Sequence, residues 1–420
     1  MFTSFSTALS GLNANSTAID VVGNNLANLN TTGFKTTQVE FQSLVTQSLG
    51  AGLGETQVGF GTGEPLTTME FTQGAIQTSA GTMDAAIQGD GFFVVKDISG
   101  NQLYTRAGNF TVDKDGNLMT DTGDYVQGWT AANTTSGGID TNGPVGNIVV
   151  PVGSLSAPAP TSTFSVEMNL NAAATVYSST DTSSDFSTPV TVYDSLGNSH
   201  VVTLDFQKSG GNAWNYTVSV PGADVGSTDT SVSVATGSLT FDANGELDPA
   251  NASPVTITVS GLADGASDLS LSWNLFNGST SEITQFAQPS AQSATAQNGS
   301  AAAELVNVGL ANGGTVLAQY SDGNQVMVGQ VAIASIRNPS TLIAMGNNNF
   351  QLSSLTASPS IGTPGTGGRG DIEGGSLEAS TVDIATEFTN LMVYQRAYEA
   401  DSRVVTTADT LSQDTINLIH

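Results

Sequence analysis

The chain has 420 residues, of which 37 are acidic and 9 basic, so its formal net charge at pH 7 is −28. This balance argues against nucleic acid or an anionic membrane surface as a partner, and the length allows two or three domains. The absence of cysteine excludes disulfides and thiolate metal sites. No apolar run reaches about 18 residues, so we expect no direct membrane insertion. A basic region followed by an apolar stretch is also missing, so we expect no cleavable signal peptide.

Residues 1–46 are expected to contribute to a terminal helical domain. A helix is predicted over about the first 30 residues, because apolar side chains recur there every seven positions, as in a helix that packs along a partner. Asp20 is the one charged residue of this stretch. Asn and Gly residues between 28 and 33 predict its end. The repeat consists of Phe5, Leu12, Ile19 and Leu26.

An inner β-domain is predicted to begin after a connector. Residues 47–70 are rich in glycine and favour a flexible linker. From residue 71 to 150 the pattern changes to β-structure, with an apolar run at 91–95 and alternating apolar and polar residues through 103–120. The turn sequence Asp115-Gly116-Asn117 within this stretch indicates a hairpin.

A second β-domain is predicted over residues 151–284, after a boundary rich in Pro, Ser and Ala at 151–160. It carries 13 acidic residues against Lys208 alone, a local charge of −12. We therefore expect this domain to lie on the outside of any assembly, where repulsion between copies is smallest. Three runs alternate as strands with one buried face do: Val202, Leu204 and Phe206; Tyr216, Val218 and Val220; Leu269, Leu271, Trp273 and Leu275.

The chain is then expected to return to the inner β-domain over residues 285–361. Two further apolar runs, at 326–336 and 341–345, predict strands there. Residues 362–376 have the composition of a second flexible, Gly-rich connector.

Residues 377–420 predict the closing helix of the terminal domain. Ser380 and Asp383 have capping-box spacing and would start it. Its apolar residues again keep a seven-residue interval in two adjacent rows, which include Ile384, Leu391, Tyr398, Val405, Leu411 and Leu418. Burying one such side chain contributes at most about 1.5–3 kcal/mol, which is small against the entropy of ordering a whole helix. We therefore expect both repeats to form contacts between copies of the chain.

The predicted fold is a multidomain α+β protein. Its N- and C-terminal helices pair as a coiled-coil core domain, and two mainly-β domains are inserted successively between them. An arrangement in which both chain ends carry interaction surfaces is more typical of a self-assembling subunit than of an enzyme.

No catalytic residue, cofactor site or metal site is predicted. The sequence has two histidines and no cysteine, and His200 lies beside a turn at the start of a strand, where a solvated edge residue is expected. Two distant histidines are too few for a zinc site. The segment beginning at Asp113 starts like a calcium loop, but Leu118 occupies the position that requires glycine, so a hairpin turn is favoured.

Several blocks of the chain resemble the bacterial flagellar rod and hook protein family. The N-terminal signature consists of Asn24, Asn25, Leu26, Asn28, Gly33, Phe34 and Lys35. Similar blocks are GDGFFVV at 89–95, YTRAGNFTVDKDGNL at 104–118 and the run at 375–411. Thr381 and Asp401 stand where the family commonly has Asn, so altered helix contacts are expected at both positions.

Within this family, the length of the chain and the block TVYDSLGNSH at 191–200 resemble the hook members. The resemblance implies a structural subunit that polymerises with itself into a hollow, flexible tube, a universal joint between rod and filament. It also implies contacts with rod, hook cap and hook–filament junction proteins, and passage through the flagellar type III export apparatus to the cell exterior. The alternatives are a stiffer distal rod protein and a secreted β-rich adhesin or carbohydrate-active protein.

Overall fold

A computed structural model describes residues 2–44, 46–49, 56–130, 138–177, 185–251 and 253–417. The chain divides into two compact units. Unit 1 comprises Met1–Val152, Asn307–Gln319 and Gln325–His420, and unit 2 comprises Gly153–Val306 and Tyr320–Asn324. Among the described residues, no helix is long and apolar enough to cross a membrane.

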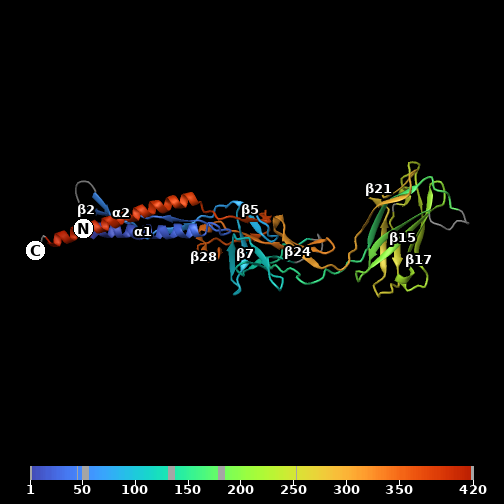
Figure 1. Cartoon of the computed structure of the whole chain (residues 1–420), viewed down its shortest axis with the longest axis horizontal. Coiled ribbons are helices and arrows are strands. Elements are labelled where there is room, and N and C mark those ends of the chain that lie inside the picture. The colour runs from blue at the N-terminus through green and yellow to red at the C-terminus, as the bar shows by residue number, and fades with distance from the viewer. Residues whose placement is uncertain are drawn as a thin grey trace. The chain divides into compact units, whose positions relative to one another are not determined.

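Two long helices from opposite ends of the chain lie side by side in unit 1 (Figure 1). They are α1 (Phe2–Ala27) and α2 (Ile384–Asn417). The predicted pairing of the terminal helices is thereby confirmed. The expected capping box at Ser380 is wrong, because α2 starts after Asp383, whose Oδ1 accepts a hydrogen bond from the backbone N–H of Thr386 at 2.8 Å.

The β-structure of unit 1 is built from short strands. A 13-stranded sheet has the main order β24-β25-β26-β11-β7-β8-β29-β28, and β9, β10, β12, β27 and β30 pair at its sides. The strands before the insertion are β7 (Phe92–Lys96), β8 (Gln102–Thr105), β9 (Phe110–Val112), β10 (Leu118–Thr120), β11 (Tyr125–Trp129) and β12 (Gly146–Asn147). Those after it are β24 (Leu305–Leu310), β25 (Thr315–Tyr320), β26 (Gln325–Val331), β27 (Ile333–Ser335), β28 (Ile343–Gly346), β29 (Asn349–Gln351) and β30 (Ser360–Gly362).

An aromatic cluster forms part of the core of this sheet. Phe71, Phe92 and Phe350 meet edge to face, with ring centroids 5.2–6.0 Å apart. The hairpin expected at Asp115-Gly116-Asn117 is present between β9 and β10, and Gly116 has a φ of 87°, which favours glycine.

Small two-stranded sheets connect the large sheet to the helices. They are β1 (Thr37–Glu40) with β4 (Leu66–Met69), β2 (Thr46–Leu49) with β3 (Thr56–Gly59), β5 (Ile76–Thr78) with β32 (Ser376–Glu378), and β6 (Ala85–Gln88) with β31 (Asp371–Gly374). Residues 1–46 and 377–420 are therefore not wholly helical, since β1 and most of β32 fall within them.

The expected flexible connectors are largely wrong. Over 362–376, where a linker was expected, the chain forms the whole of β31 and enters β32. Arg369 stabilises the turn between β30 and β31, because its guanidinium donates to the Thr363 carbonyl at 3.0 Å and to the Thr366 hydroxyl at 2.7 Å. In the other connector, β2, β3 and β4 are strands, and residues 50–55 lie outside the described part of the chain.

Unit 2 contains two main sheets. One has four strands in the order β14-β15-β16-β17, and the other has the order β18-β19-β13-β22 with β23 beside β13. The strands are β13 (Thr163–Asn171), β14 (Phe186–Tyr193), β15 (Ser199–Lys208), β16 (Ala213–Pro221), β17 (Ser231–Thr240), β18 (Val255–Val259), β19 (Leu269–Asn274), β22 (Ile283–Phe286) and β23 (Ala291–Gln297). A short ribbon pairs β20 (Phe276–Asn277) with β21 (Thr280–Ser281).

The alternating residues predicted as strand faces form a shared core in unit 2. Val202, Leu204 and Phe206 of β15 are fully buried with Trp273 of β19. The chain was expected to return to the inner β-domain at residue 285, which is too early. β23 pairs antiparallel with β13, so the chain stays in unit 2 until Val306. The polar faces of β23 concealed this strand from the hydrophobic pattern.

Candidate assembly surface

The two terminal helices meet along a seam of small and polar side chains. In α1 the buried residues recur every seven positions, but the repeat is made of Ala8, Asn15 and Val22, with Ala18 and Asn25 beside it. At Gly11 a Cβ would lie 2.5 Å from Oδ2 of Asp401, so glycine permits the close approach of α2. Alanine and glycine at these positions bring the backbones together without a bulky apolar interface.

Hydrogen bonds cross this seam at two positions along the helices. Asn15 donates from Nδ2 to Oδ2 of Asp401 at 3.1 Å, so the carboxylate at 401 is the acceptor for Asn15. Asn25 donates to Oε1 of Glu387 at 3.1 Å and to the Thr37 carbonyl at 2.9 Å, and its Oδ1 accepts from the Thr37 N–H. The signature residue Asn25 therefore joins α1, α2 and β1.

The predicted heptad residues do not form this seam. Phe5 is 41% exposed, Tyr398 42% and Leu411 54%, whereas Leu12, Ile19, Leu26, Leu391 and Val405 are half-buried. Ile384 is also exposed, and Leu418 lies outside the described residues. Side chains at the edge of a helical contact retain accessible area because the seam is occupied by the small and polar row.

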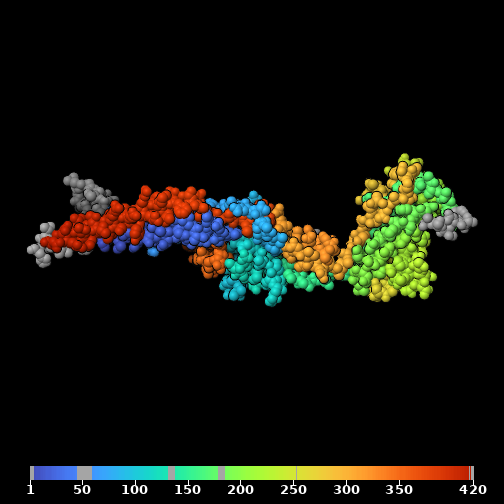
Figure 2. All heavy atoms as spheres, viewed as in Figure 1, coloured from blue at the N-terminus to red at the C-terminus, as the bar shows by residue number. Residues whose placement is uncertain are grey.

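The two helices lie against each other in Figure 2. Apolar side chains that this contact does not bury form an outer apolar surface. We define it by its exposed members: Phe5, Leu9, Ile384, Phe388, Met392, Val393, Tyr398, Val404 and Leu411. Met392 and Val393 are 54% and 57% exposed. Large apolar side chains that stay exposed on a helical pair favour binding of other proteins.

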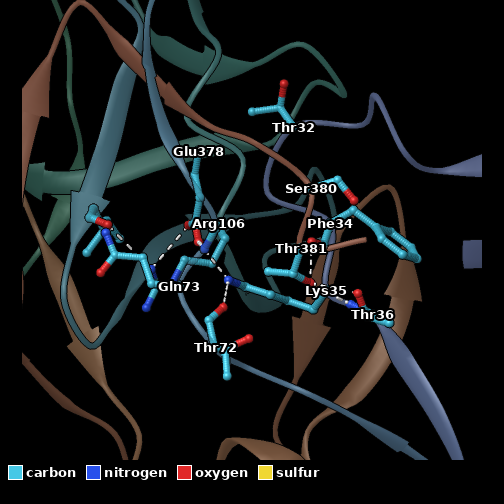
Figure 3. A network of polar contacts seen from close by, with 12 residues as sticks. Thr32, Phe34, Lys35, Thr36, Thr72, Gln73, Arg106, Glu378, Ser380 and Thr381 are labelled. Atoms are coloured by element: carbon cyan, nitrogen blue, oxygen red, sulfur yellow. Dashed lines mark hydrogen bonds and ion pairs between the residues drawn. The ribbon is translucent and has the colours of Figure 1, made fainter. Parts of the chain in front are cut away.

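A buried ionic cluster, here called the junction network, joins the segments that follow α1 and precede α2 (Figure 3). Glu378 accepts from Lys35 Nζ at 2.7 Å and from Arg106 Nη1 at 3.2 Å, and all three side chains are almost fully buried. Lys35 also donates to the Thr72 carbonyl at 2.6 Å, and Glu378 accepts from the Gly74 N–H at 2.7 Å. The network joins the segment after α1, the β-domain and the segment before α2.

The junction network depends on each of its charges. Burial lowers the pKa of Lys35 below its ordinary value, although the Glu378 carboxylate opposes this by favouring the charged amine. Removing one member of a buried ion pair leaves its partner uncompensated, at a cost of about 3–5 kcal/mol. Lys35 is part of the signature seen in the sequence, but its ion-pair partner Glu378 is 343 residues away in the chain (378 − 35).

The rest of the N-terminal signature shapes the path from α1 to β1. Asn28 donates from Nδ2 to the Asn24 carbonyl at 2.9 Å, which ends the helix. Gly33 has a φ of 69°, and a Cβ there would lie 2.6 Å from the Arg106 carbonyl carbon. The Phe34 carbonyl accepts from the backbone N–H of Thr381 at 3.2 Å.

Thr381, the second departure from the family's usual Asn, also contacts this path. Its hydroxyl accepts from the Thr36 N–H at 2.9 Å and lies 2.9 Å from the Thr36 hydroxyl. Thr381 therefore makes a polar contact between the segments that follow α1 and precede α2.

His200 of unit 2 lies at the start of β15, as expected, but the expectation that it is solvated is wrong. It is buried rather than solvated, with Nδ1 2.9 Å from Asp224 and Nε2 3.2 Å from Asp194 and 3.4 Å from Asp264. Burial opposes the charged imidazole, but hydrogen bonds to Asp224 and Asp194 outweigh it and raise the pKa of His200. Asp194, His200 and Asp264 offer possible ligand atoms within 4.8 Å of one another, and both ring nitrogens of His200 already lie within hydrogen-bond distance of carboxylate oxygens.

Four flagellar family descriptions match the chain. Residues 5–35 match "Flagella basal body rod protein", 86–169 "Flagellar hook protein FlgE/F/G D1 domain", 169–300 "Flagellar basal body protein FlaE D2 domain", and 373–418 "Flagellar basal body rod FlgEFG protein C-terminal". The first of these covers most of α1, and the last contains α2.

Relatives that match over nearly the whole of both chains are also flagellar hook proteins. The flagellar hook protein FlgE of Borreliella burgdorferi is 32% identical, with 100% of both chains covered. The FlgE of Salmonella typhimurium is 33% identical, with 99% of this chain and 100% of the relative covered. The crystal structure of Helicobacter pylori FlgE2 resembles this chain in fold, with a TM-score of 0.51 at 14% identity over 71% of this chain and 99% of that one. The chain thus belongs to the flagellar hook protein family.

Proposed function

We propose that this hook subunit polymerises through its helical pair into a hollow, flexible tube that transmits torque from the flagellar rod to the filament. The observation that carries the proposal is the outer apolar surface, which remains exposed after α1 and α2 have paired. Burial against neighbouring copies would stabilise the polymer by up to about 1.5–3 kcal/mol for each side chain that becomes fully buried.

The remaining partners follow from membership of the family. The subunit would contact rod, hook cap and hook–filament junction proteins, and would reach the outside of the cell through the flagellar type III export apparatus. Its role is mechanical, and we assign it no enzymatic activity. The acidic residues of unit 2 suit an outward position, because like charges discourage association between neighbouring tubes.

Charge substitution on the outer apolar surface tests the proposal. The variant Phe388→Asp/Met392→Asp places two carboxylates at positions that are 52% and 54% exposed, so the folded subunit should tolerate them. We expect the critical concentration for polymerisation to rise about tenfold or more per substitution, which corresponds to about 1.4 kcal/mol each. Sedimentation and electron microscopy of purified protein would measure this.

Leu196→Asp is the matched control, since it adds a charge at a position of unit 2 that is 56% exposed. It should form tubes as the unaltered chain does. Leu12→Asp and Leu391→Asp are also expected to prevent assembly while unit 2 stays folded. Normal tubes from the Phe388→Asp/Met392→Asp variant, or no tubes from the unaltered chain, would contradict the proposal.

A further inference from the structure

A polar groove lies beside the seam at the start of α2. Its volume is about 380 Å³, and its lining includes Val22, Thr37, Glu70, Asp383, Glu387 and Asn390. Three of these residues are acidic, and no basic residue lines the groove. Such a site favours a cationic group that can donate several hydrogen bonds.

Glu387 gives the groove an unsatisfied acceptor. The residue is only 5% exposed, and its Oε1 is engaged by Asn25, but its buried Oε2 has no hydrogen-bond partner among the described residues. Burial raises the pKa of this carboxyl, against the lowering effect of the Asn25 hydrogen bond, and the nearby Asp383 carboxylate raises it further. A buried acceptor without a donor costs about 1–3 kcal/mol, so a donor supplied from outside would be stabilised there.

The complementary cations lie on another side of the same helix. Arg396 and Arg403 are the only basic residues in the sequences of α1 and α2. Both are exposed, and neither forms an ion pair with any residue in the described part of the chain. Nine residues separate Glu387 from Arg396 (396 − 387), which is about half a turn around an α-helix. The same molecule therefore cannot bring these arginines into its own groove while α2 remains helical.

We propose that, in the polymer, the groove receives a guanidinium of Arg396 or Arg403 from α2 of a second copy of this chain. This inference rests on the proposed polymerisation and names one of its contacts. A guanidinium presents a planar set of donors that can reach Glu387 Oε2 together with the carboxylate of Glu70 or Asp383. Because the donor face and the groove lie on different sides of α2, each copy can receive one neighbour and bind the next, and such head-to-tail contacts build open helical filaments.

Neutralising the arginines tests the contact. For Arg396→Gln/Arg403→Gln we expect a critical concentration at least about tenfold higher, with less dependence on salt, because charge-assisted hydrogen bonds are lost. The matched control, Lys96→Gln/Lys114→Gln, removes two exposed cations of the β-domain and should leave assembly unchanged. If the unaltered chain polymerises and the arginine variant does so equally well, the inference is wrong and the proposed function stands. If the unaltered chain does not polymerise, both fall.

A cysteine pair would locate the contact directly, because the chain has no cysteine of its own. Asn390→Cys lies in the groove, and Ala400→Cys lies one turn beyond Arg396 on the exposed side. Within one helix these positions are about 15 Å apart, too far for a disulfide. Oxidised polymer of the double variant should give a ladder of covalent oligomers on a non-reducing gel, whereas each single variant should give dimers at most. Polymer that yields no ladder would overturn the inference.

Discussion

The helical pair and unit 2 bury opposite kinds of side chain. In unit 2 the large apolar residues, such as Trp273 and Phe206, are fully enclosed between the sheets. In the helical pair most of the enclosed residues are small or polar, such as Ala18 and Asn25, and most of the large apolar ones are exposed or half-buried. Unit 2 therefore satisfies its own hydrophobic surface, whereas the helices leave theirs for a neighbouring molecule.

Truncation of the core of unit 2 should have the largest effect on stability. Trp273→Ala removes a fully buried ring from between the sheets, and we expect a loss of about 4 kcal/mol in the free energy of unfolding, measured in urea. Leu9→Ala truncates an exposed apolar residue of α1 and should change the free energy of unfolding by less than about 0.5 kcal/mol. Equal losses of unfolding free energy in the two variants would contradict the difference in burial between unit 2 and the helical pair.

Loss of the junction anion should rank second. Glu378→Gln leaves Lys35 and Arg106 buried without a carboxylate, and we expect unit 1 to lose about 3 kcal/mol. The control Glu373→Gln changes an exposed residue of the adjacent strand β31 and should be near neutral. Thermal unfolding followed by circular dichroism would compare them, and an unaffected Glu378→Gln protein would show that the network contributes little.

A polar bond of the seam should contribute less. Asp401→Ala removes the acceptor of Asn15, for which we expect a loss of about 1 kcal/mol in the stability of the helical pair. Asp409→Ala removes an exposed bond to Gln413 within α2 and should cost less than about 0.5 kcal/mol. Helicity at 222 nm during unfolding is the measurement. A larger effect of Asp409→Ala would indicate that the seam is misassigned.

The smallest effect is the pH dependence of unit 2. The pKa of His200 is raised above its unfolded value of about 6.5, so its stabilising effect is complete below that pH and is lost as pH rises through the folded pKa. We expect stability to fall there by no more than about 1.4 kcal/mol per pH unit for this one group. Urea unfolding between pH 6 and 9 should show a slope that His200→Asn abolishes. An equal slope in the variant would assign the dependence to other groups.

Asp194 should act at the acidic end of the range. Burial opposes its ionisation, but hydrogen bonds from its neighbours, including the Asn198 backbone, hold its pKa well below the usual value. Its contribution is therefore present above the unfolded pKa of about 3.9 and is lost as pH falls through the folded pKa.

The periodic elements could be predicted from the sequence, but the role of each face could not. A seven-residue repeat identified both terminal helices, and alternation identified strands such as β15 and β19. The buried seam was missed because Ala8, Gly11 and Asn15 carry little hydrophobic signal. Where a helix has one side for its own chain and another for a neighbour, the stronger apolar stripe need not face inward.

Composition was a weaker guide to the loops and polar sites. Glycine in 362–376 suggested flexibility, although Gly365 and Gly375 have φ values of 68° and 65° and serve ordered turns. Glu378 and the carboxylates around His200 could not be paired in advance, because most of their partners come from segments far apart in the sequence. Burial of a charge depends on tertiary contacts that no local pattern records.

The joining of both chain ends in the junction network has a mechanical consequence. Lys35 precedes β1 and Glu378 ends β32, so tension along either terminal helix reaches the same buried ion pair. Neither end can be drawn out alone, since displacement of residue 35 would also break the hydrogen bonds between Thr36 and Thr381. The segments around Lys35 and Glu378 therefore bear tension together, through β1 and β32.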